Sequence, residues 1–158
     1  MNPSPQIAQH FRGVFFGGNW TTVNVKDTLA AITWKQALEQ VGSFNTIATL
    51  SFHLSYFVHE VLPVLKGGPL TAHDKFSFDH PPIHSQEDWE AFQKEILKDA
   101  EEFATLVEQI PAEDWDAPFT DPKYGTLYRN IHGIIEHSHY HLGQIALIKK
   151  QLLEAQKK

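Results

Sequence analysis

Cysteine is absent from this sequence of 158 residues. Its absence excludes disulfide bonds, iron–sulfur clusters, zinc sites with cysteine ligands and a cysteine nucleophile. A chain without cysteine suits a reducing compartment, so the expected location is the cytoplasm. The first residues hold no cationic segment followed by an unbroken apolar stretch, so no secretory signal is predicted.

Long apolar runs and dense basic stretches are also missing. The most apolar stretch, IATLSFHLSYFV, is too short and too often interrupted by polar residues to cross a bilayer, so no membrane contact is predicted. The formal net charge is −6 and no stripe of Lys and Arg occurs, so nucleic acid is not an expected partner. The chain has no internal repeat, and its length fits a single domain covering residues 1–158.

Four long segments carry apolar residues at helical spacing. The second of them is apolar nearly all round, as in a helix deep inside a bundle. Ser85, followed three residues later by Asp88, predicts the cap that begins the third segment. No segment alternates as a strand does, so we predict an all-α fold, a four-helix bundle. The expected helices cover about residues 6–16, 45–65, 85–109 and 126–153.

Glycine and proline separate these helices. Residues 66–84 hold two adjacent Gly and three Pro, which predicts a long crossover loop between the second and third helices. Residues 111–125 are expected to form a second loop, and residues 19–32 an irregular connector. The connector leads to Thr33 and Gln36, a capping box that opens a short turn of helix. Pro63 is expected to bend or end the second helix.

Three histidines crowd the stretch EHSHYHLGQI. His137 and His141 are four residues apart, so they lie side by side on one helical face. His139, between them, points away. His132 lies about 180° from His141 around a regular helix, so it cannot share a site with it. Only His137 and His141 are natural partners in this helix.

The spacing of this pair is weak evidence by itself. The chain has ten histidines, and chance would produce about one such spacing in a chain of this composition. His80 and His84 have the same spacing in HPPIH, but the two prolines forbid a helix there. We expect these two side chains to be solvated loop imidazoles.

His53 is the candidate third donor because it lies in the middle of the most apolar helix. A histidine in such a place needs a polar partner. One interpretation is a core imidazole bonded to a hydroxyl or carbonyl group. The other is a metal site formed by His53, His137 and His141, because three imidazoles from two helices leave the open positions that catalytic zinc and related divalent ions need.

The roles of the polar residues nearby stay open. His59 lies about 120° around the helix from His53, so we expect it to face another interface or solvent. Glu60 and Glu136 either orient ligand imidazoles or are exposed helix charges. Gln144 continues the row of the histidine pair by one turn. No Glu follows the first His of HSHYH, which disfavours a metalloprotease of the H-E-x-x-H type. Four aromatic residues are candidates for lining a pocket, although core packing is favoured for most of them: Trp20, Trp34, Tyr56 and Phe57.

Three stretches together resemble the DinB-like superfamily, which also contains the YfiT-like thiol transferases. They are TLSFHLSYF around His53, IIEHSHYHLGQI near the end of the chain, and GGNWTTVNVKDTLAAITWKQAL near its start. The resemblance covers about residues 7–153. It implies a four-helix bundle with a long crossover, and a divalent ion such as zinc, nickel or iron held at His53, His137 and His141. Tyr140 stands where many relatives have another histidine.

The resemblance also implies a class of chemistry. Characterised relatives transfer low-molecular-weight thiols such as bacillithiol or mycothiol, or isomerise substrates with a thiol cofactor, and dimers are common among them. We therefore expect a metal-dependent transfer of a small thiol to an electrophilic small molecule, in a homodimer. Two alternatives stay open: a hydrolase that uses water activated by the ion, and a non-catalytic bundle that binds a metal or a small molecule.

Overall fold

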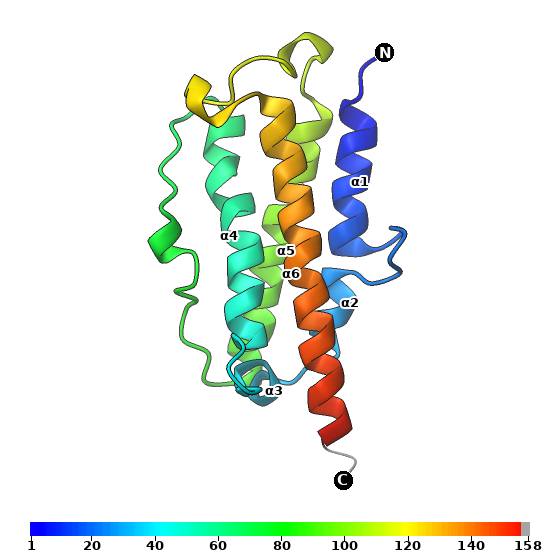
Figure 1. Cartoon of the computed structure of the whole chain (residues 1–158), viewed down its shortest axis with the longest axis vertical. Helices are drawn as coiled ribbons and strands as arrows, with labels where there is room; N and C mark the ends of the chain where they lie inside the picture. Colours follow the sequence, from blue (N-terminus) through cyan, green and yellow to red (C-terminus); the bar gives the residue numbers. More distant parts are fainter. Residues whose placement is uncertain (156–158) are drawn as a thin grey trace.

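The structure is a computed structural model, and it describes residues 1–155 (Figure 1). These residues form six α-helices and no β-strand, apart from one isolated bridge between Pro118 and Thr126. The prediction of an all-α fold is therefore confirmed. The helices are α1 (Ser4–Phe16), α2 (Val25–Ala30), α3 (Trp34–Leu38), α4 (Ile47–Leu65), α5 (Gln86–Glu108) and α6 (Leu127–Ala155).

The four long helices, α1, α4, α5 and α6, run along the long axis of the molecule (Figure 1). Helix α4 packs against both α5 and α6, and α1 packs mainly against α5. The short helices α2 and α3 lie near one end of this group, and the segment of residues 66–85 passes along the outer side of α4 (Figure 1). None of the helices within residues 1–155 is both long enough and apolar enough to cross a membrane.

Side chains at the predicted positions cap the N-terminal ends of α3 and α5. The hydroxyl group of Ser85 accepts a hydrogen bond from the backbone N–H of Asp88. Thr33 and Gln36 form both bonds of a capping box at the start of α3. These bonds satisfy backbone donors that have no partner inside the helix. Pro63 lies inside the last turn of α4, which ends two residues later, as expected.

The prediction of an irregular connector over residues 19–32 is wrong in part, because α2 forms within it. Asn24 caps this helix by accepting a hydrogen bond from the backbone N–H of Asp27 at 2.9 Å, and its amide donates to the Asp27 carboxylate at 2.8 Å. Val25 and Leu29 are then buried in the core. A helix of six residues is too short to show a periodic apolar pattern, so only its cap could have predicted it.

The core between the helices consists largely of aromatic and branched side chains. Phe11 of α1 packs against Phe15 and against Phe103 of α5, with ring centroids 4.7 and 4.5 Å apart. Trp89 is fully buried and donates a hydrogen bond to the carbonyl oxygen of Ile32 at 2.9 Å. Each of these buried side chains stabilises the fold by about 2 kcal/mol. The core holds α4 and α6 in a fixed relative position, on which the site depends.

Candidate metal centre

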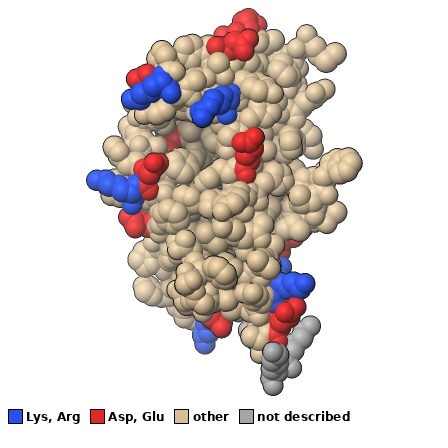
Figure 2. Space-filling view, in the orientation of Figure 1, with Lys and Arg blue, Asp and Glu red and all other residues tan. Residues whose placement is uncertain are grey.

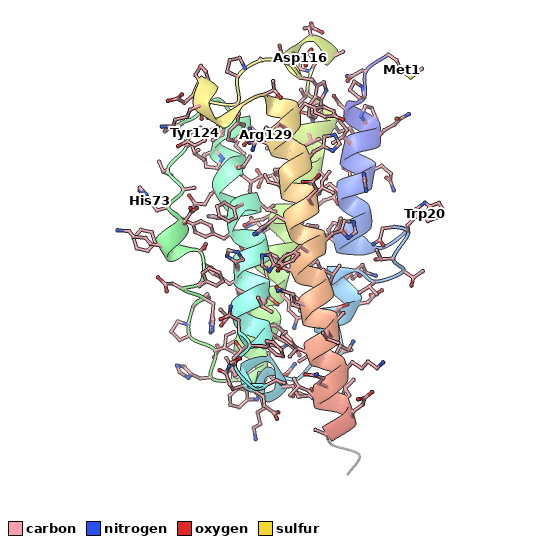
Figure 3. All side chains as sticks on the ribbon, in the orientation of Figure 1. Met1, Trp20, His73, Asp116, Tyr124 and Arg129 are labelled. Atoms are coloured by element: carbon pink, nitrogen blue, oxygen red, sulfur yellow. The ribbon has the colours of Figure 1, made fainter. Side chains whose placement is uncertain are left out.

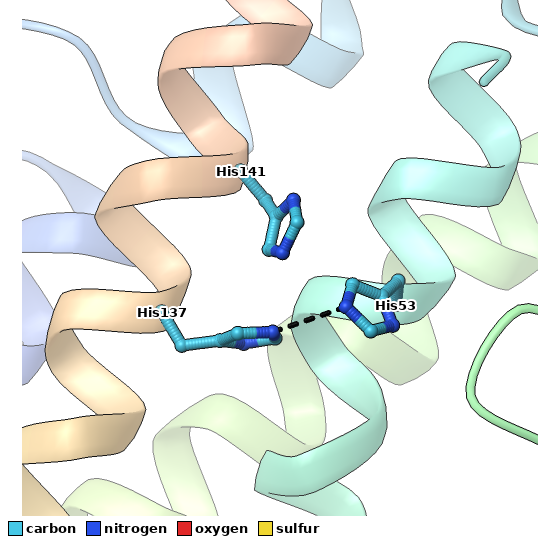
Figure 4. A group of neighbouring side chains, drawn as sticks. All are labelled: His53, His137 and His141. Atoms are coloured by element: carbon cyan, nitrogen blue, oxygen red, sulfur yellow. Dashed lines mark hydrogen bonds between the residues drawn. The ribbon is translucent and has the colours of Figure 1, made fainter. Parts of the chain in front are cut away.

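Three imidazoles from two helices meet in the interior between α4 and α6. His53 comes from α4, and His137 and His141 come from successive turns of α6 (Figure 4). One ring nitrogen of each lies within 4.8 Å of the others, and the Nε2 atoms of His53 and His137 are 3.1 Å apart. His141 is buried and the other two are partly buried. The structure thus brings the three predicted residues to one point.

The surroundings of His53 determine which of its nitrogens carries the proton. Its Nδ1 lies 3.2 Å from the carbonyl oxygen of Ser77 and 3.0 Å from the hydroxyl oxygen of the same residue. A carbonyl oxygen can only accept, and the Ser77 hydroxyl donates its own proton to the carbonyl oxygen of Asp74 at 2.7 Å. Nδ1 of His53 is therefore the donor, and in the neutral ring Nε2 keeps a free lone pair.

His141 is oriented in the same way by a different partner. Its Nδ1 lies 2.7 Å from the side-chain carbonyl oxygen of Gln144, one turn later on α6. Because that oxygen accepts, Nδ1 donates and Nε2 is again unprotonated in the neutral ring. Two lone pairs therefore point to the place where Nε2 of His137 also lies. A cation bound between them satisfies all three nitrogens, so the residues present fit a divalent ion.

Burial favours the neutral imidazole that a metal ligand must be. Burial, together with the neighbouring His141 and His53, lowers the pKa of His137 to about 4. Burial also lowers the pKa of His53, the nearby His141 acts in the same direction, and the bond to the Ser77 backbone opposes the shift. A neutral ring at pH 7 offers its lone pair without first losing a proton.

Aromatic rings enclose the cluster on the α4 side. Phe78 stacks on the His53 ring, with centroids 3.9 Å apart and an angle of 9° between the planes. Phe57 places its ring edge-to-face with both His53 and His137 at 5.9 and 5.3 Å. These contacts restrict the rotation of the imidazoles, so the donor geometry is set before any ligand binds.

Ser77 and Gln144, rather than Glu60 or Glu136, form hydrogen bonds with imidazoles of the cluster. Ser77 was not predicted, because it is 24 residues from His53 in a segment without periodicity. Gln144 was singled out by its spacing, without a role. Glu60 lines a separate cavity between α4 and α5, and Glu136 is exposed. Neither carboxylate has a hydrogen bond to the three imidazoles.

The other histidines of α4 and α6 lie outside the cluster, as their helical angles predicted. His59 pairs with Asp99 of α5, at 2.6 Å, and its side chain is 67% exposed. His132 packs on Tyr128 with ring centroids 4.1 Å apart. His139 faces α1, where its ring centroid is 6.3 Å from that of His10. Burial lowers the pKa of His132 and of His139, and His10 acts in the same direction.

The pair in HPPIH does not form a site either. His80 bonds through Nδ1 to the carbonyl oxygen of Pro81 at 2.8 Å, and His84 is exposed. Both residues lie in the loop before α5, where no helix aligns their side chains. Their interpretation as loop imidazoles agrees with this placement.

Two cavities border the cluster at different residues. The larger, which we call the α4–α6 cavity, is half-open and measures about 600 Å³. Its lining includes Phe57, His137 and Arg129. The smaller, which we call the Phe78 cavity, measures about 420 Å³, and its lining includes Phe78 and His141. His137 therefore borders one space of ligand size and His141 another, and the two linings share no residue.

The four candidate aromatic residues differ in their surroundings. Phe57 lines the α4–α6 cavity. Tyr56 is buried, and its hydroxyl bonds to the backbone of His73 in the long loop at 3.0 Å. Trp34 packs partly buried against the core. Trp20 is fully exposed, so for this residue both the pocket interpretation and the core interpretation are wrong.

The chain is thus an all-helical protein with a cluster of three histidines between two of its long helices. The family model of the DinB superfamily matches residues 19–145. Because this match covers most of the chain, the protein belongs to the DinB superfamily, and the resemblance predicted from the sequence is confirmed. A search of curated proteins and a search of solved structures gave no significant match.

Proposed function

We propose that this protein is a metal-dependent enzyme that transfers a low-molecular-weight thiol to an electrophilic small molecule. His53, His137 and His141 hold a divalent ion of the zinc, nickel or iron type through their Nε2 atoms. Such an ion lowers the pKa of a thiol or water molecule that reaches its open positions. The convergence of three lone-pair donors supports the ion, and the two adjoining cavities support the transfer.

The two cavities support a transfer over simple hydrolysis. A transfer needs one place for the thiol and another for its acceptor, with the reacting atoms brought together. The α4–α6 cavity is lined in part by His137 and the Phe78 cavity in part by His141, so each space borders one of the proposed metal ligands. Since the chain contains no cysteine, the sulfur atom must come from a cosubstrate.

The proposed reaction is a nucleophilic displacement. The thiol loses its proton to solvent, and its sulfur atom forms a bond to an electrophilic carbon. The bond from that carbon to the leaving group breaks, and the leaving group takes the electron pair and then a proton. The rings of Phe57 and Phe78 beside the imidazoles exclude water from the reacting atoms, which strengthens the electrostatic interactions there.

Metal content of purified variants tests the ligand assignment. We expect about one divalent ion per chain in the wild type by elemental analysis. His53→Ala and His141→Ala should abolish binding, because two imidazoles leave too few donors. His139→Ala is the matched control, since its side chain faces α1, and it should keep its ion. Equal loss in all three variants would refute the assignment.

Titration of the cobalt-loaded protein tests the chemistry. A small thiol that binds as thiolate should produce a sulfur-to-cobalt charge-transfer absorption, and the band should be absent in His141→Ala. A wild-type protein that shows no such band but hydrolyses esters without thiol supports the hydrolase instead. Bound metal with neither thiol binding nor hydrolysis supports a non-catalytic bundle.

The proposal extends to architecture and assembly. The four long helices suggest a four-helix bundle of the DinB/YfiT type, with residues 66–84 as the crossover between α4 and α5. We also propose a cytoplasmic homodimer whose partners are small molecules. On the face drawn in Figure 2, charged side chains are scattered and most of the surface is uncharged, which gives no support to nucleic-acid binding. Light scattering of the purified chain tests the dimer.

A further inference from the structure

One row of residues on α6 links the histidine cluster to a positive charge. Arg129, Gly133 and His137 follow one another at intervals of four, so they lie along one face of the helix. All of them line the α4–α6 cavity. Arg129 lies about 12 Å from His137 along the helix axis. The cavity therefore extends from a proposed metal ligand at one end to a guanidinium group at the other.

Gly133 keeps the middle of this row open. A Cβ atom added at this residue would meet no other atom within 4 Å, so the space above it belongs to the cavity. Glycine inside a helix costs about 1 kcal/mol relative to alanine, and no packing contact requires the glycine here. A larger side chain at Gly133 would project into the space between Arg129 and His137.

The charge of Arg129 is not neutralised within the described part of the chain. Its Nη1 donates to the backbone carbonyl oxygen of Tyr124 at 3.1 Å, and no carboxylate of residues 1–155 forms an ion pair with it. The same carbonyl oxygen accepts from the Asn130 amide at 2.9 Å. Figure 3 shows Arg129 near the beginning of α6, with Tyr124 in the turn before it. A guanidinium group has further N–H donors for a ligand.

The carboxylates that line the cavity belong to the opposite end. Asp74 is joined through its carbonyl oxygen to Ser77, which holds His53. Glu136 is adjacent to His137 in the chain. Both line the same cavity as Arg129. The cavity is thus positive at the Arg129 end and negative around the histidines, where a divalent ion would offset the negative charge.

We infer that the α4–α6 cavity takes an elongated ligand that ends in a carboxylate. The carboxylate binds Arg129, with the planar match of two N–H groups to two oxygens that guanidinium groups favour. The middle of the ligand passes over Gly133 between Phe57, Val61 and Ile134, and its reactive end reaches the histidine cluster. This inference rests on the proposed metal site and adds a substrate class to the proposed function.

Two hydroxamate probes test the inference. The test is the same for a thiol-dependent and for a water-dependent enzyme. Suberic acid monohydroxamate carries a metal-binding head and a terminal carboxylate, and octanohydroxamate carries the same head and a terminal methyl group. Calorimetric titration of the metal-loaded wild type should show the carboxylate probe binding roughly three- to tenfold more tightly, as expected for a partly exposed charged pair. The metal content is measured in the same samples.

Three variants locate the effect. In Arg129→Gln the two probes should bind equally, with the ion retained. Gly133→Leu should weaken both probes at least about tenfold, because its side chain fills the path of the ligand. Gly143→Leu is the matched control: it makes the same change in the same helix, also into open space, but outside the cavity lining. It should bind both probes as the wild type does.

The remaining outcomes of these titrations contradict either the inference or the proposed function. Equal binding of the two probes by the metal-loaded wild type overturns the inference, and so does discrimination that persists in Arg129→Gln. Unchanged binding by Gly133→Leu overturns the assignment of the ligand to this cavity. A wild type that takes up no metal refutes the proposed function itself, and the inference with it.

Discussion

The ring nitrogen that carries the proton decides whether a neutral imidazole can direct a lone pair into the site. Ser77 and Gln144 accept from the Nδ1 atoms of His53 and His141, so both rings direct an unprotonated Nε2 inward. Without these acceptors the proton could move to Nε2, which would remove the lone pair from the site. The two acceptors therefore fix which ring nitrogen keeps a free lone pair, as well as the orientation of each ring.

Gln144→Leu tests this selection. Leucine has a similar size but no acceptor, so Nδ1 of the buried His141 loses its partner and its proton is no longer fixed there. We expect metal affinity, measured by competition with a chelator, to fall about tenfold to a hundredfold. Gln151→Leu, on an exposed position of the same helix, is the control. An affinity within a factor of two of the wild type would contradict the proposed role of Gln144.

The sequence predicts the three nitrogen donors but only some of the residues that bond to them. His53 could be predicted because a histidine among apolar neighbours needs a partner, and the α6 pair because four residues make about one helical turn. Ser77 could not be predicted, because its contact with His53 depends on how a loop without periodicity lies against α4. Arg129 was missed because a lone arginine at the start of a helix carries no motif.

Capping side chains determine where the short elements of the fold begin. Asn24 starts α2 through one hydrogen bond to a backbone N–H and another to the Asp27 carboxylate. Helix α2 contacts α1, α5 and α6, so it closes one end of the core. Because an isolated helix of six residues is unstable in water, its existence depends on this cap and on tertiary packing.

Asn24→Ala should therefore reduce the free energy of unfolding by about 1 kcal/mol or somewhat more, since the cap is lost and Asn24 is buried. Urea denaturation of the metal-free protein measures the change. Asn45→Ala is the control, because Asn45 is exposed and the neighbouring Thr46 caps α4. A loss no greater than that of the control would show that α2 does not depend on its cap.

Element length explains which helices the sequence could predict. The four long helices repeat their apolar pattern over several turns, so their existence and approximate bounds follow from periodicity. Helix α2 spans fewer than two turns, and the 3-10 turns Asp74–Phe76, Ala112–Asp114 and Pro122–Tyr124 are shorter still. Such elements leave no periodic signal, and only local hydrogen bonds and packing define them.

The stability of the whole molecule should depend on pH through its partly buried histidines. The folded-state pKa of His137 is about 4 and that of His53 is also lowered, whereas an unfolded chain has a histidine pKa of about 6.5. Below that pH the unfolded state binds more protons than the folded state. Stability is therefore lost as the pH falls from about 6.5 toward about 4.

We accordingly expect the urea midpoint of the metal-free protein to fall steadily between about pH 7 and pH 4.5. His137→Gln removes the most strongly shifted group, so its midpoint should fall less over the same range. Circular dichroism follows both proteins in matched buffers. An equal decline in wild type and variant would show that other groups account for the acid sensitivity.

The histidine cluster constrains the sequences of α4 and α6 more strictly than those of α1 and α5. Helices α1 and α5 meet through Phe11, Phe103 and the ion pairs of Arg12, and they supply none of the three donors. Their residues can be substituted as long as the packed faces keep their shape and apolar character. Helices α4 and α6 must also keep their rotational phase, since a single inserted residue turns everything beyond it by about 100°. Natural insertions should therefore occur mainly in α1, in α5 and in the loops.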